Sequence, residues 1–533
     1  MAYAVDPREP LPDVSRPPEP LCDDDLLASW TLSTSSKSPM TAVLLANDPS
    51  RKVGARLSRL LIVVAFGFVA PMEHAVAAST PLVTDVLPSG VPLPAPAPDF
   101  APAVSDASTE LLGNAGGVRP WLDRHGVQIN LQDVEELWGL ASGGVSPGPA
   151  YDGITAVTLQ LNTQQAFGWH DGLFNISALQ IRGRSLTNER LQSLNAVSGY
   201  DAGRSTRLFE LWYGQGFFGN RLDVRVGSID LDTEFLVSQN ASLFLNASFG
   251  WPLSTSSNLY SGGPSWPYSA VGVRVKWAPA HPLVLMGAVT DDNPTHGPFY
   301  SSVAANQRDP SGTQFSTKGG ALFIGEAQLW VDAARRLATG DNAALPGTWK
   351  VGALFDTGRF PDQRYDDRGG LLGSPDSDGR PFYHRGNWMA YTVIDQMLWR
   401  AAKGRQKAIS VFIRATANDG VRNRFASEVE AGLTFDGLVP GRIDDTIGIA
   451  WGTTLYGRRA LESARDAIRL GGSGAADLKP ENHLELTWQI AVTPYLNLQP
   501  DLQYFWNVGG MAQGSSGGIA NGFVAGLNMT TTF

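Results

Sequence analysis

The chain has 533 residues and a formal net charge of -10, and charged residues make up only 17% of it, below the average of about a quarter for soluble globular proteins. Its 58 Gly, 15 Trp and mean hydropathy of -0.11 are typical of a sheet that faces lipid on one side and water on the other. The acidic balance argues against a nucleic-acid partner, and the single cysteine, Cys22, excludes an internal disulfide and a Cys-based zinc site. The seven His show no metal-ligand spacing, so we expect no metal.

Residues 51–78 have the three parts of a secretory signal peptide. Basic residues come first, an apolar core of about ten residues follows, and small residues end the segment. The core is too short to cross a bilayer as a helix, which takes about 20 residues. We therefore expect export with cleavage of this segment.

The signal lies unusually far from the first methionine. A stretch rich in Asp, Glu and Pro precedes it, whereas signal peptides normally start close to the initiator. We expect translation to start at Met40, so that residues 1–39 are a mis-assigned extension and residues 40–78 are the signal peptide; an extended signal from Met1 is the alternative. Residues 79–108 are rich in Pro and Ala, cannot bury a core and are interpreted as a linker.

A short helical segment is predicted within residues 109–126, with Pro120 at an early helical position and Gly126 at its end. After it, the pattern changes to the alternation of β-strands: in YSAVGVRVKW, residues 268–277, valines alternate with Gly, Arg and Lys. Segments with the same two-faced alternation lie at 153–167, 323–331, 428–435 and 483–492. Each is about ten residues long, as a transmembrane β-strand requires.

The connections between these segments fall into two classes. Short ones lie at 167–172, 217–221, 278–282, 437–442 and 492–495, and long polar ones at 185–204, 230–267, 291–320, 357–386 and 456–480. Outer-membrane barrels have short turns at one end and long loops at the other. We therefore predict an all-β fold, a transmembrane antiparallel β-barrel of about 16 strands over residues 127–533, in a bacterial outer membrane.

Two observations qualify this interpretation. The alternation is lost near Asp133, where we expect a bulge or the end of a strand. A soluble β-sandwich or propeller would also tolerate the alternation. Neither would require a secretory signal together with Trp and Tyr residues at strand ends, where the aromatic girdle of a membrane barrel lies.

Residues 214–219 read GQGFFG and match the G-x-G-x-x-G phosphate-binding fingerprint of dinucleotide-binding enzymes. That fingerprint needs a strand before it and a helix after it, but the following residues, NRLDVRVGS, continue as a strand. We predict instead a periplasmic hairpin turn at Gly219 and Asn220, residue types that accept a positive φ. Phe217 and Phe218 would then lie at the membrane edge.

Four stretches resemble the OprB-type carbohydrate-selective porins: LLGNAGGVRPWLDRHGVQINLQ, GGVSPGPAYDGITAVTLQLN, YGQGFFGNRLDVRVGSIDLDTEF and HLELTWQIAVTPYLNLQPDLQYFWNVGG. The last strand ends on Phe533, which resembles the C-terminal signature of proteins delivered to the barrel-assembly machinery. The resemblance implies a passive channel for small, glucose-like mono- or oligosaccharides, with neither enzyme activity nor a cofactor. It also implies contact with membrane lipid, lipopolysaccharide and the barrel-assembly machinery.

A neutral sugar must exchange its hydrogen bonds to water for wall bonds of similar strength, so we expect charges of both signs and an aromatic face in the pore. The predicted pore-lining and sugar-contact residues are Arg182, Arg184, Glu210, Trp212, Arg225, Arg274, Glu326 and Trp330. The favoured ones, on successive strands, are Arg182, Arg184, Glu210, Trp212 and Arg225. For each, a solvated wall charge away from the constriction is the alternative. Residues 230–267 are a second candidate for narrowing the lumen, with a surface cover as the alternative.

Three other functions are compatible with a membrane barrel. A general diffusion porin and a non-conducting barrel for adhesion or assembly are the alternatives to a selective porin, and a barrel hydrolase is the least favoured. A hydrolase needs a Ser/His constellation: His483 lies on the polar side of its strand with Glu485, but GSSGG at 514–518 is not a nucleophile elbow. We expect no catalytic residues.

Overall fold

The computed structural model describes residues 109–280, 282–339, 344–401, 407–470, 477–511 and 518–533. The described residues belong to one compact unit. The predicted N-terminal extension (1–39), signal peptide (40–78) and linker (79–108) lie outside the described residues.

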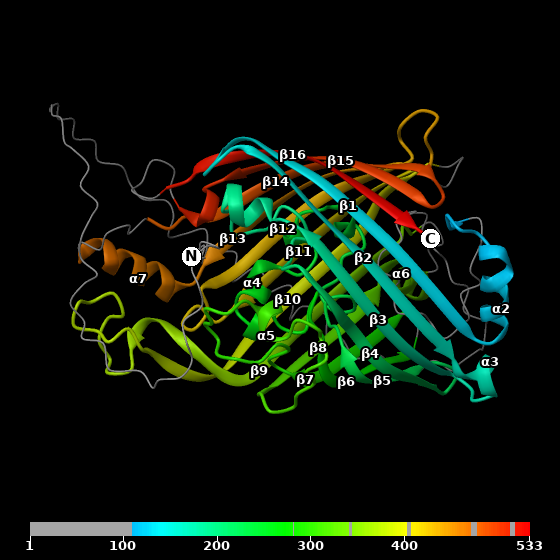
Figure 1. Cartoon of the computed structure of the whole chain (residues 1–533), viewed down its shortest axis with the longest axis horizontal. Coiled ribbons are helices and arrows are strands. Elements are labelled where there is room, and N and C mark those ends of the chain that lie inside the picture. Colours follow the sequence, from blue (N-terminus) through cyan, green and yellow to red (C-terminus); the bar gives the residue numbers. More distant parts are fainter. Residues whose placement is uncertain (1–108, 281, 340–343, 402–406, 471–476, 512–517) are drawn as a thin grey trace, which may run out of the picture. The chain divides into compact units, whose positions relative to one another are not determined.

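The strands form one closed antiparallel barrel, which confirms the predicted fold (Figure 1). Each strand pairs with its neighbours in the chain, and β16 pairs with β1 to close the sheet. The strands are β1 (Val127–Gly144), β2 (Gly148–Asn162), β3 (Gly172–Gly183), β4 (Ser205–Phe217), β5 (Leu222–Ile229), β6 (Ala270–Ala280), β7 (Leu283–Asp291), β8 (Ala321–Trp330), β9 (Gly347–Asp366), β10 (Pro381–Arg400), β11 (Ala408–Asn418), β12 (Phe425–Asp436), β13 (Thr446–Tyr456), β14 (Glu481–Thr493), β15 (Leu496–Trp506) and β16 (Ala520–Thr532).

The helices are short. They are η2 (Ala115–Gly117), α2 (Val118–Arg124), α3 (Thr163–Phe167), η3 (Thr187–Leu191), η4 (Ala241–Leu243), η5 (Ala247–Phe249), α4 (Leu253–Ser256), η6 (Tyr260–Gly262), α5 (Ala305–Arg308), α6 (Val331–Thr339), α7 (Arg458–Arg469) and η7 (Val508–Gly510). Helix α2 is the predicted N-terminal helix. Over the described ranges, no helix is both long and apolar enough to span a membrane.

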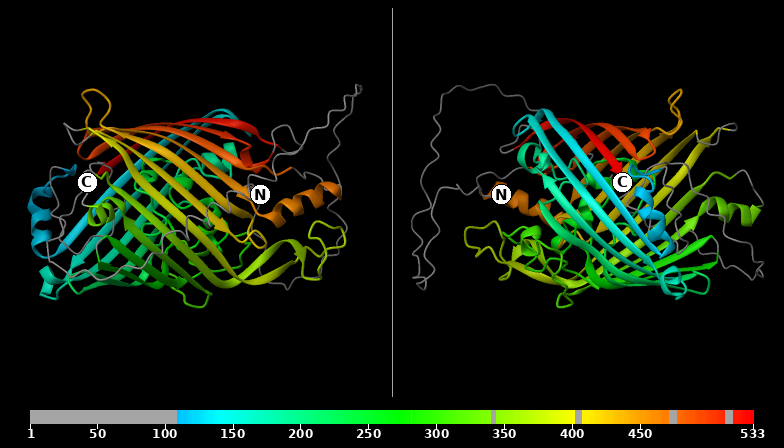
Figure 2. Two further views of the ribbon diagram at one scale, coloured as in Figure 1. Left: turned by 180° about the vertical axis from the view of Figure 1, so that it is seen from behind. Right: turned by 45° about the vertical axis from the view of Figure 1, so that its right-hand side comes forward.

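The two ends of the barrel differ. Helices α2 and α3 and the C-terminus lie at one end, together with short turns such as 494–495, and α7 lies at the opposite end, where the long loops gather (Figures 1 and 2). By the construction rule of outer-membrane barrels, the short turns face the periplasm and the long loops face outward from the cell. The predicted long connections agree with the structure, except for residues 357–386.

That exception arises from an unusually long hairpin. Strands β9 and β10 continue pairing to Asp366 and Pro381, so the loop between them covers only residues 367–380. Beyond the membrane both faces of such a hairpin meet water, and the alternation that identifies a strand in the sequence disappears.

Side chains alternate between lipid and lumen along each strand, as β3 illustrates. Phe174 and Ile176 are exposed on the outer surface, whereas Asn175 and Ser177 between them are buried inside. Strand β1 follows the same rule without interruption: Asp133 pairs with Thr155 and with Thr531 in regular register, and the register shifts only beyond Leu140. The predicted bulge or strand end at Asp133 was therefore wrong.

The GQGFFG stretch forms the predicted hairpin turn. Phe217 ends β4, pairs with Leu222 of β5, and three residues of positive φ lie between them: Phe218 at 56°, Gly219 at 65° and Asn220 at 63°. A Cβ added at Gly219 would meet no atom within 4 Å, so the backbone conformation alone favours glycine there. No helix follows the glycines, which removes the basis for a nucleotide site.

Candidate functional site

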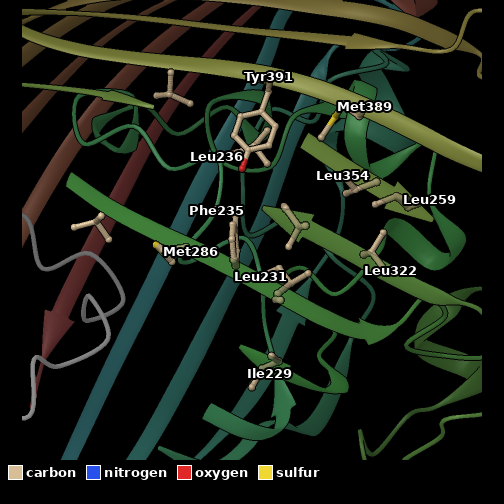
Figure 3. Close-up of a cluster of buried hydrophobic side chains, with 14 of the residues drawn as sticks. Ile229, Leu231, Phe235, Leu236, Leu259, Met286, Leu322, Leu354, Met389 and Tyr391 are labelled. Carbon is tan, nitrogen blue, oxygen red and sulfur yellow. The ribbon is translucent and has the colours of Figure 1, made fainter. Parts of the chain in front are cut away.

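Loop L3, residues 230–269 between β5 and β6, lies inside the barrel. Leu231, Phe235 and Leu236 are fully buried and pack against apolar side chains of β8, β9 and β10 (Figure 3). Burial of these side chains supplies an apolar driving force for the inward position. The predicted segment 230–267 therefore narrows the lumen and is not a surface cover.

Carboxylates on the inner wall accept hydrogen bonds from the backbone of L3. Glu326 of β8 accepts the Leu236 N–H at 3.0 Å, and Asp395 of β10 accepts the Asn240 N–H at 3.1 Å. Equivalent bonds join Ser254 to Glu428 of β12 at 2.8 Å, and Leu245 and Asn246 to Glu485 of β14 at 2.6 and 3.0 Å. A typical hydrogen bond within a protein contributes about 0.5–1.5 kcal/mol net, and the four acidic side chains together supply several such bonds. The row of carboxylates fixes L3 across the lumen from β5 to β14.

Arg414 of β11 is the main cationic anchor of L3. Its side chain is buried, and its Nε lies 2.6 Å from Glu430 Oε2. The two Nη atoms donate to three loop carbonyls: Leu236 at 3.1 Å, Gly250 at 2.7 Å, and Ser248. Arg414 therefore neutralises a wall carboxylate and binds two separate parts of L3 at once.

Loop L2, residues 184–204, also enters the lumen. Glu481 of β14 accepts the N–H groups of Leu194 and Asn195, both at 2.8 Å. The Asn195 side chain donates to Thr454 Oγ1 of β13 at 3.1 Å. Two loops from the same end of the barrel thus narrow the passage.

A group of charges lies where L3 leaves the wall. Glu234 of L3 binds two arginines: its Oε1 is 2.6 Å from Arg225 Nη1, and its Oε2 is 2.7 Å from Arg274 Nε. Asp223 forms an ion pair with Arg274 and lies 3.7 Å from Arg225 Nε. All four side chains are largely buried, so each charge is balanced by a neighbour of opposite sign.

An aromatic ring completes this group. The Arg225 guanidinium lies over the Trp212 ring, 4.2 Å from its centroid. The Trp212 indole N–H donates to Glu210 at 3.2 Å, and Glu210 also accepts the Asp230 N–H at 3.3 Å. The six residues that form this lumen cluster are Glu210, Trp212, Asp223, Arg225, Glu234 and Arg274.

The acidic residues at the start of L3 titrate differently from one another. Burial, reinforced by the charge of nearby Asp232, raises the pKa of Asp230 well above its ordinary value. Burial also raises the pKa of Asp232. Burial acts on Glu234 in the same direction, but Arg225 and Arg274 outweigh it and hold the pKa of Glu234 below its ordinary value. Glu234 therefore stays charged in the cluster, while Asp230 keeps its proton to a higher pH than a free aspartate.

Four predicted site residues meet in the lumen cluster: Glu210, Trp212, Arg225 and Arg274. Glu326 also faces the lumen, but it anchors L3 and accepts the Tyr391 hydroxyl at 2.9 Å. Trp330 is the last residue of β8, at the short-turn end of the barrel, and is 37% exposed.

The structure separates the other two predicted residues from this group. Arg182 lies on the outward face of β3, on the same side as Phe174 and Ile176. Arg184 lies beyond the end of β3, where its side chain is 68% exposed and pairs with Glu189 at 2.9 Å. The prediction that these arginines converge on the pore was wrong. The inner positions of β3 carry Leu179 and Ile181, which pack beneath the loops, so polarity did not identify the inner face here.

Sequence reasoning missed the anchors of the two loops. Asp395, Glu481 and Glu485 are inward acidic residues on separate strands, and none was proposed as a loop ligand. Acidic residues recur at inward positions of several strands, and this recurrence is the feature of the sequence that could have indicated a set of loop anchors. The loop atoms they bind cannot be identified from strand periodicity.

The sequence and the fold are similar to those of known porins. A sequence profile described as carbohydrate-selective porin, OprB family, matches residues 146–533. The chain belongs to the OprB family. It is 25% identical over 458 residues to Porin B of Pseudomonas aeruginosa, across 81% of this chain and 93% of that protein. The high-pH structure of Pseudomonas putida OprB shares the fold, with a TM-score of 0.69 and 23% identity over 81% of this chain and 100% of that one.

As a member of the OprB family, the protein is a carbohydrate-selective porin, a channel of the outer membrane. The narrowing by L2 and L3 and the balanced charges of the lumen cluster fit such a channel. In the part of the chain that the structure describes, no group of three or more His, Cys, Asp or Glu side chains could hold a metal ion.

Proposed function

We propose that small, glucose-like mono- or oligosaccharides diffuse passively through the lumen and contact the wall at the lumen cluster. The observation that supports this is the pairing of Arg225 and Arg274 with Glu234 beside the Trp212 ring. Arginines donate and carboxylates accept, so the exposed parts of Arg225 and Glu234, 7% and 12% of their side chains, offer both kinds of partner to sugar hydroxyl groups. Because the charges largely cancel, a neutral solute is not disfavoured against an ion.

Weak, multiple contacts suit passage better than one tight site. A sugar that enters must replace its hydrogen bonds to water by wall bonds of similar strength, and it must leave again without a high barrier. L2 and L3 restrict the size of the solute, since both are fixed to the wall by several hydrogen bonds to acidic side chains. The small size of a sugar and its ability to form hydrogen bonds with the wall would together favour its passage over that of other solutes.

We also propose that the chain reaches the outer membrane through a cleaved signal peptide and the barrel-assembly machinery. Its outward apolar residues, such as Phe174 and Ile176, would contact lipid, with lipopolysaccharide around the long-loop end. The terminal strand β16 ends at Thr532, next to Phe533. N-terminal sequencing of the mature protein tests the cleavage, and a mature chain that still carries residues 40–78 would contradict it.

Single-channel recording in planar bilayers tests the proposed site. Glucose added to the bath should reduce the ion current of the native protein in a saturable way. Glu234→Gln removes the charge between the two arginines and should weaken this effect by about fivefold or more, the equivalent of about 1 kcal/mol. Asp332→Asn, in α6 at the short-turn end of the barrel, is the matched control and should change nothing, since Asp332 pairs with Arg336 at the surface.

The outcomes separate the alternatives. A current that glucose does not affect would favour a general diffusion porin, and no current would favour a non-conducting barrel. A glucose effect that Glu234→Gln leaves unchanged would place the sugar contacts elsewhere in the lumen.

A further inference from the structure

Two arginines lie opposite each other on the long β9–β10 hairpin, at the long-loop end of the barrel (Figure 1). Arg359 of β9 and Arg385 of β10 are direct partners in register, and both side chains are exposed. Phe360, the next residue on β9, is fully buried and packs against the ring of Tyr260 in L3. Because neighbouring residues of a strand point to opposite faces, the arginine pair points away from the lumen, to the outside.

Exposed aromatic residues mark the height of the lipid on this part of the wall. Trp388 and Trp399 lie near the two ends of β10. At about 3.3 Å per residue and a strand tilt of about 40°, the interval between them rises about 28 Å, close to the apolar band of about 25 Å in such barrels. Phe323, Phe355 and Trp388 share one row of the sheet, and all three are exposed. This row therefore marks the outer edge of the lipid, where the aromatic girdle lies.

The arginine pair lies just beyond this aromatic row. Arg385 is three residues from Trp388, and Arg359 is four residues from Phe355, both in the direction of the long loops. With the same rise and tilt, the pair lies about 8–10 Å above the row. The polar layer on each side of the hydrocarbon core begins within this distance. Arg359 and Arg385 therefore face the headgroups of the outer leaflet and not the lipid tails.

No acidic side chain balances the charges of this pair within the residues that the structure describes, where neither guanidinium group forms an ion pair or donates a hydrogen bond. The Arg359 guanidinium lies 5.8 Å from the centroid of the Tyr383 ring. A third arginine nearby, Arg422, is neutralised by Asp419, 2.8 Å from its Nε. Like charges directly opposite each other on neighbouring strands are destabilising. An anion between the two arginines would remove this repulsion.

The backbone that carries the pair is held in place. Arg422 Nη1 donates to the carbonyls of Arg385 and Gly386, at 3.1 and 2.5 Å. The register of β9 and β10 shifts between Arg385 and Asn387, and Gly386 there has a φ of 77°. Because this part of the hairpin is fixed from a neighbouring loop, an anion that binds the pair needs to order only the two arginine side chains.

We propose that Arg359 and Arg385 bind a phosphate group of lipopolysaccharide, the phosphorylated glycolipid of the outer leaflet. Planar guanidinium groups match phosphate oxygens with pairs of charge-assisted hydrogen bonds, and the Tyr383 hydroxyl adds a donor beside them. The aromatic row below the pair contacts acyl chains, so a ligand that carries both phosphate and acyl chains meets both surfaces. This site rests on the contact with lipopolysaccharide proposed above, and it is separate from sugar passage because it lies outside the barrel.

Native mass spectrometry of the detergent-solubilised porin tests the site, with purified lipopolysaccharide as the probe. The double variant Arg359→Gln, Arg385→Gln should bind lipopolysaccharide at least about tenfold more weakly than the native protein. The control is Arg221→Gln, Arg335→Gln, which removes two exposed arginines from the short-turn end and should bind like the native protein. Both double variants change the net charge equally, so a general loss of positive charge would weaken both alike and would overturn the proposal.

Enzymatically dephosphorylated lipopolysaccharide gives a second test, which needs no variant and decides if the double variant fails to fold. The native protein should bind it as weakly as the Arg359→Gln, Arg385→Gln variant binds the intact form, and equal binding of both forms would overturn the proposal. Displacement of the intact form by an equal concentration of inorganic phosphate would show a general anion site instead.

The results also separate this site from the proposals on which it rests. Equal binding of intact lipopolysaccharide by the native protein and the double variant would overturn only the assignment to Arg359 and Arg385. A native protein that does not bind it would overturn the proposed contact with lipopolysaccharide as well. Glucose uptake into liposomes that lack lipopolysaccharide should be native in the double variant, and a loss of uptake would contradict a site separate from the pore.

Discussion

Replacing Arg414 by Met should loosen L3 and widen the pore. The substitution keeps an unbranched chain about as long as the aliphatic part of arginine but removes the ion pair with Glu430 and the bonds to the carbonyls of Leu236, Ser248 and Gly250. Removing one partner of a buried ion pair costs about 3–5 kcal/mol, since the other charge stays buried without compensation. The barrel itself should persist, because β11 keeps its backbone bonds to β10 and β12.

The free energy that favours the inward position of L3 over a displaced position should therefore decrease by several kcal/mol. In liposome swelling, the rate for a disaccharide relative to glucose should rise at least about fivefold in Arg414→Met, the effect of about 1 kcal/mol on a barrier. Arg442→Met is the control: Arg442 pairs with Asp445 at 2.5 Å in a short turn, is 39% exposed and should leave the ratio of rates unchanged. A folded Arg414→Met with the native ratio of rates would refute the assignment of Arg414 as the anchor of L3.

Three further predictions concern L2, titration and the turn. Asn195→Ala removes the side-chain bonds to Thr454 and Glu481 and should raise disaccharide swelling less than Arg414→Met does; a larger rise would make L2 the main size filter. The pKa of Asp230 is raised in the folded protein, so the folded state binds this proton more tightly than the unfolded chain does. The resulting contribution of Asp230 to the free energy of unfolding is complete below the ordinary pKa of aspartate and is lost as the pH rises through the pKa of Asp230 in the folded protein. The unfolding temperature should thus fall more steeply as the pH rises above the ordinary pKa of aspartate in the native protein than in Asp230→Asn, and equal slopes would contradict this. Gly219→Val forces a β-branched residue to a φ of 65° and should lower the free energy of unfolding by about 1–2 kcal/mol, whereas Gly139→Ala, at an uncrowded strand position, should have little effect.

Strand periodicity was sufficient to predict the barrel. The length of the segments, the two classes of connection and the terminal strand follow from a sheet between lipid and water. The turn at Gly219 and Asn220 was also predictable, since few residue types accept its backbone angles. The turn depends on residues that are neighbours in sequence, and the strand pattern depends on lipid and water, which are the same for every strand.

The alternation of polar and apolar residues did not identify the lumen-facing side of a strand where loops, and not water, cover the inner wall. Beneath L2 and L3 the inner wall carries apolar residues such as Ile154 and Ile181, so a polar residue no longer marks the lumen. Arg182 and Asp133 were misinterpreted for this reason: one was assigned to the pore and the other to a bulge. The loop anchors were missed for a related reason, since Glu485 contacts residues about 240 positions away in sequence.

Uptake of labelled glucose into liposomes that contain the purified native protein measures carbohydrate selectivity directly. A carbohydrate-selective channel should give an influx that saturates with glucose concentration and is competed by unlabelled glucose, but not by a neutral solute of equal size without sugar hydroxyl groups. Influx that rises linearly with concentration and is indifferent to both competitors would contradict a carbohydrate-selective channel.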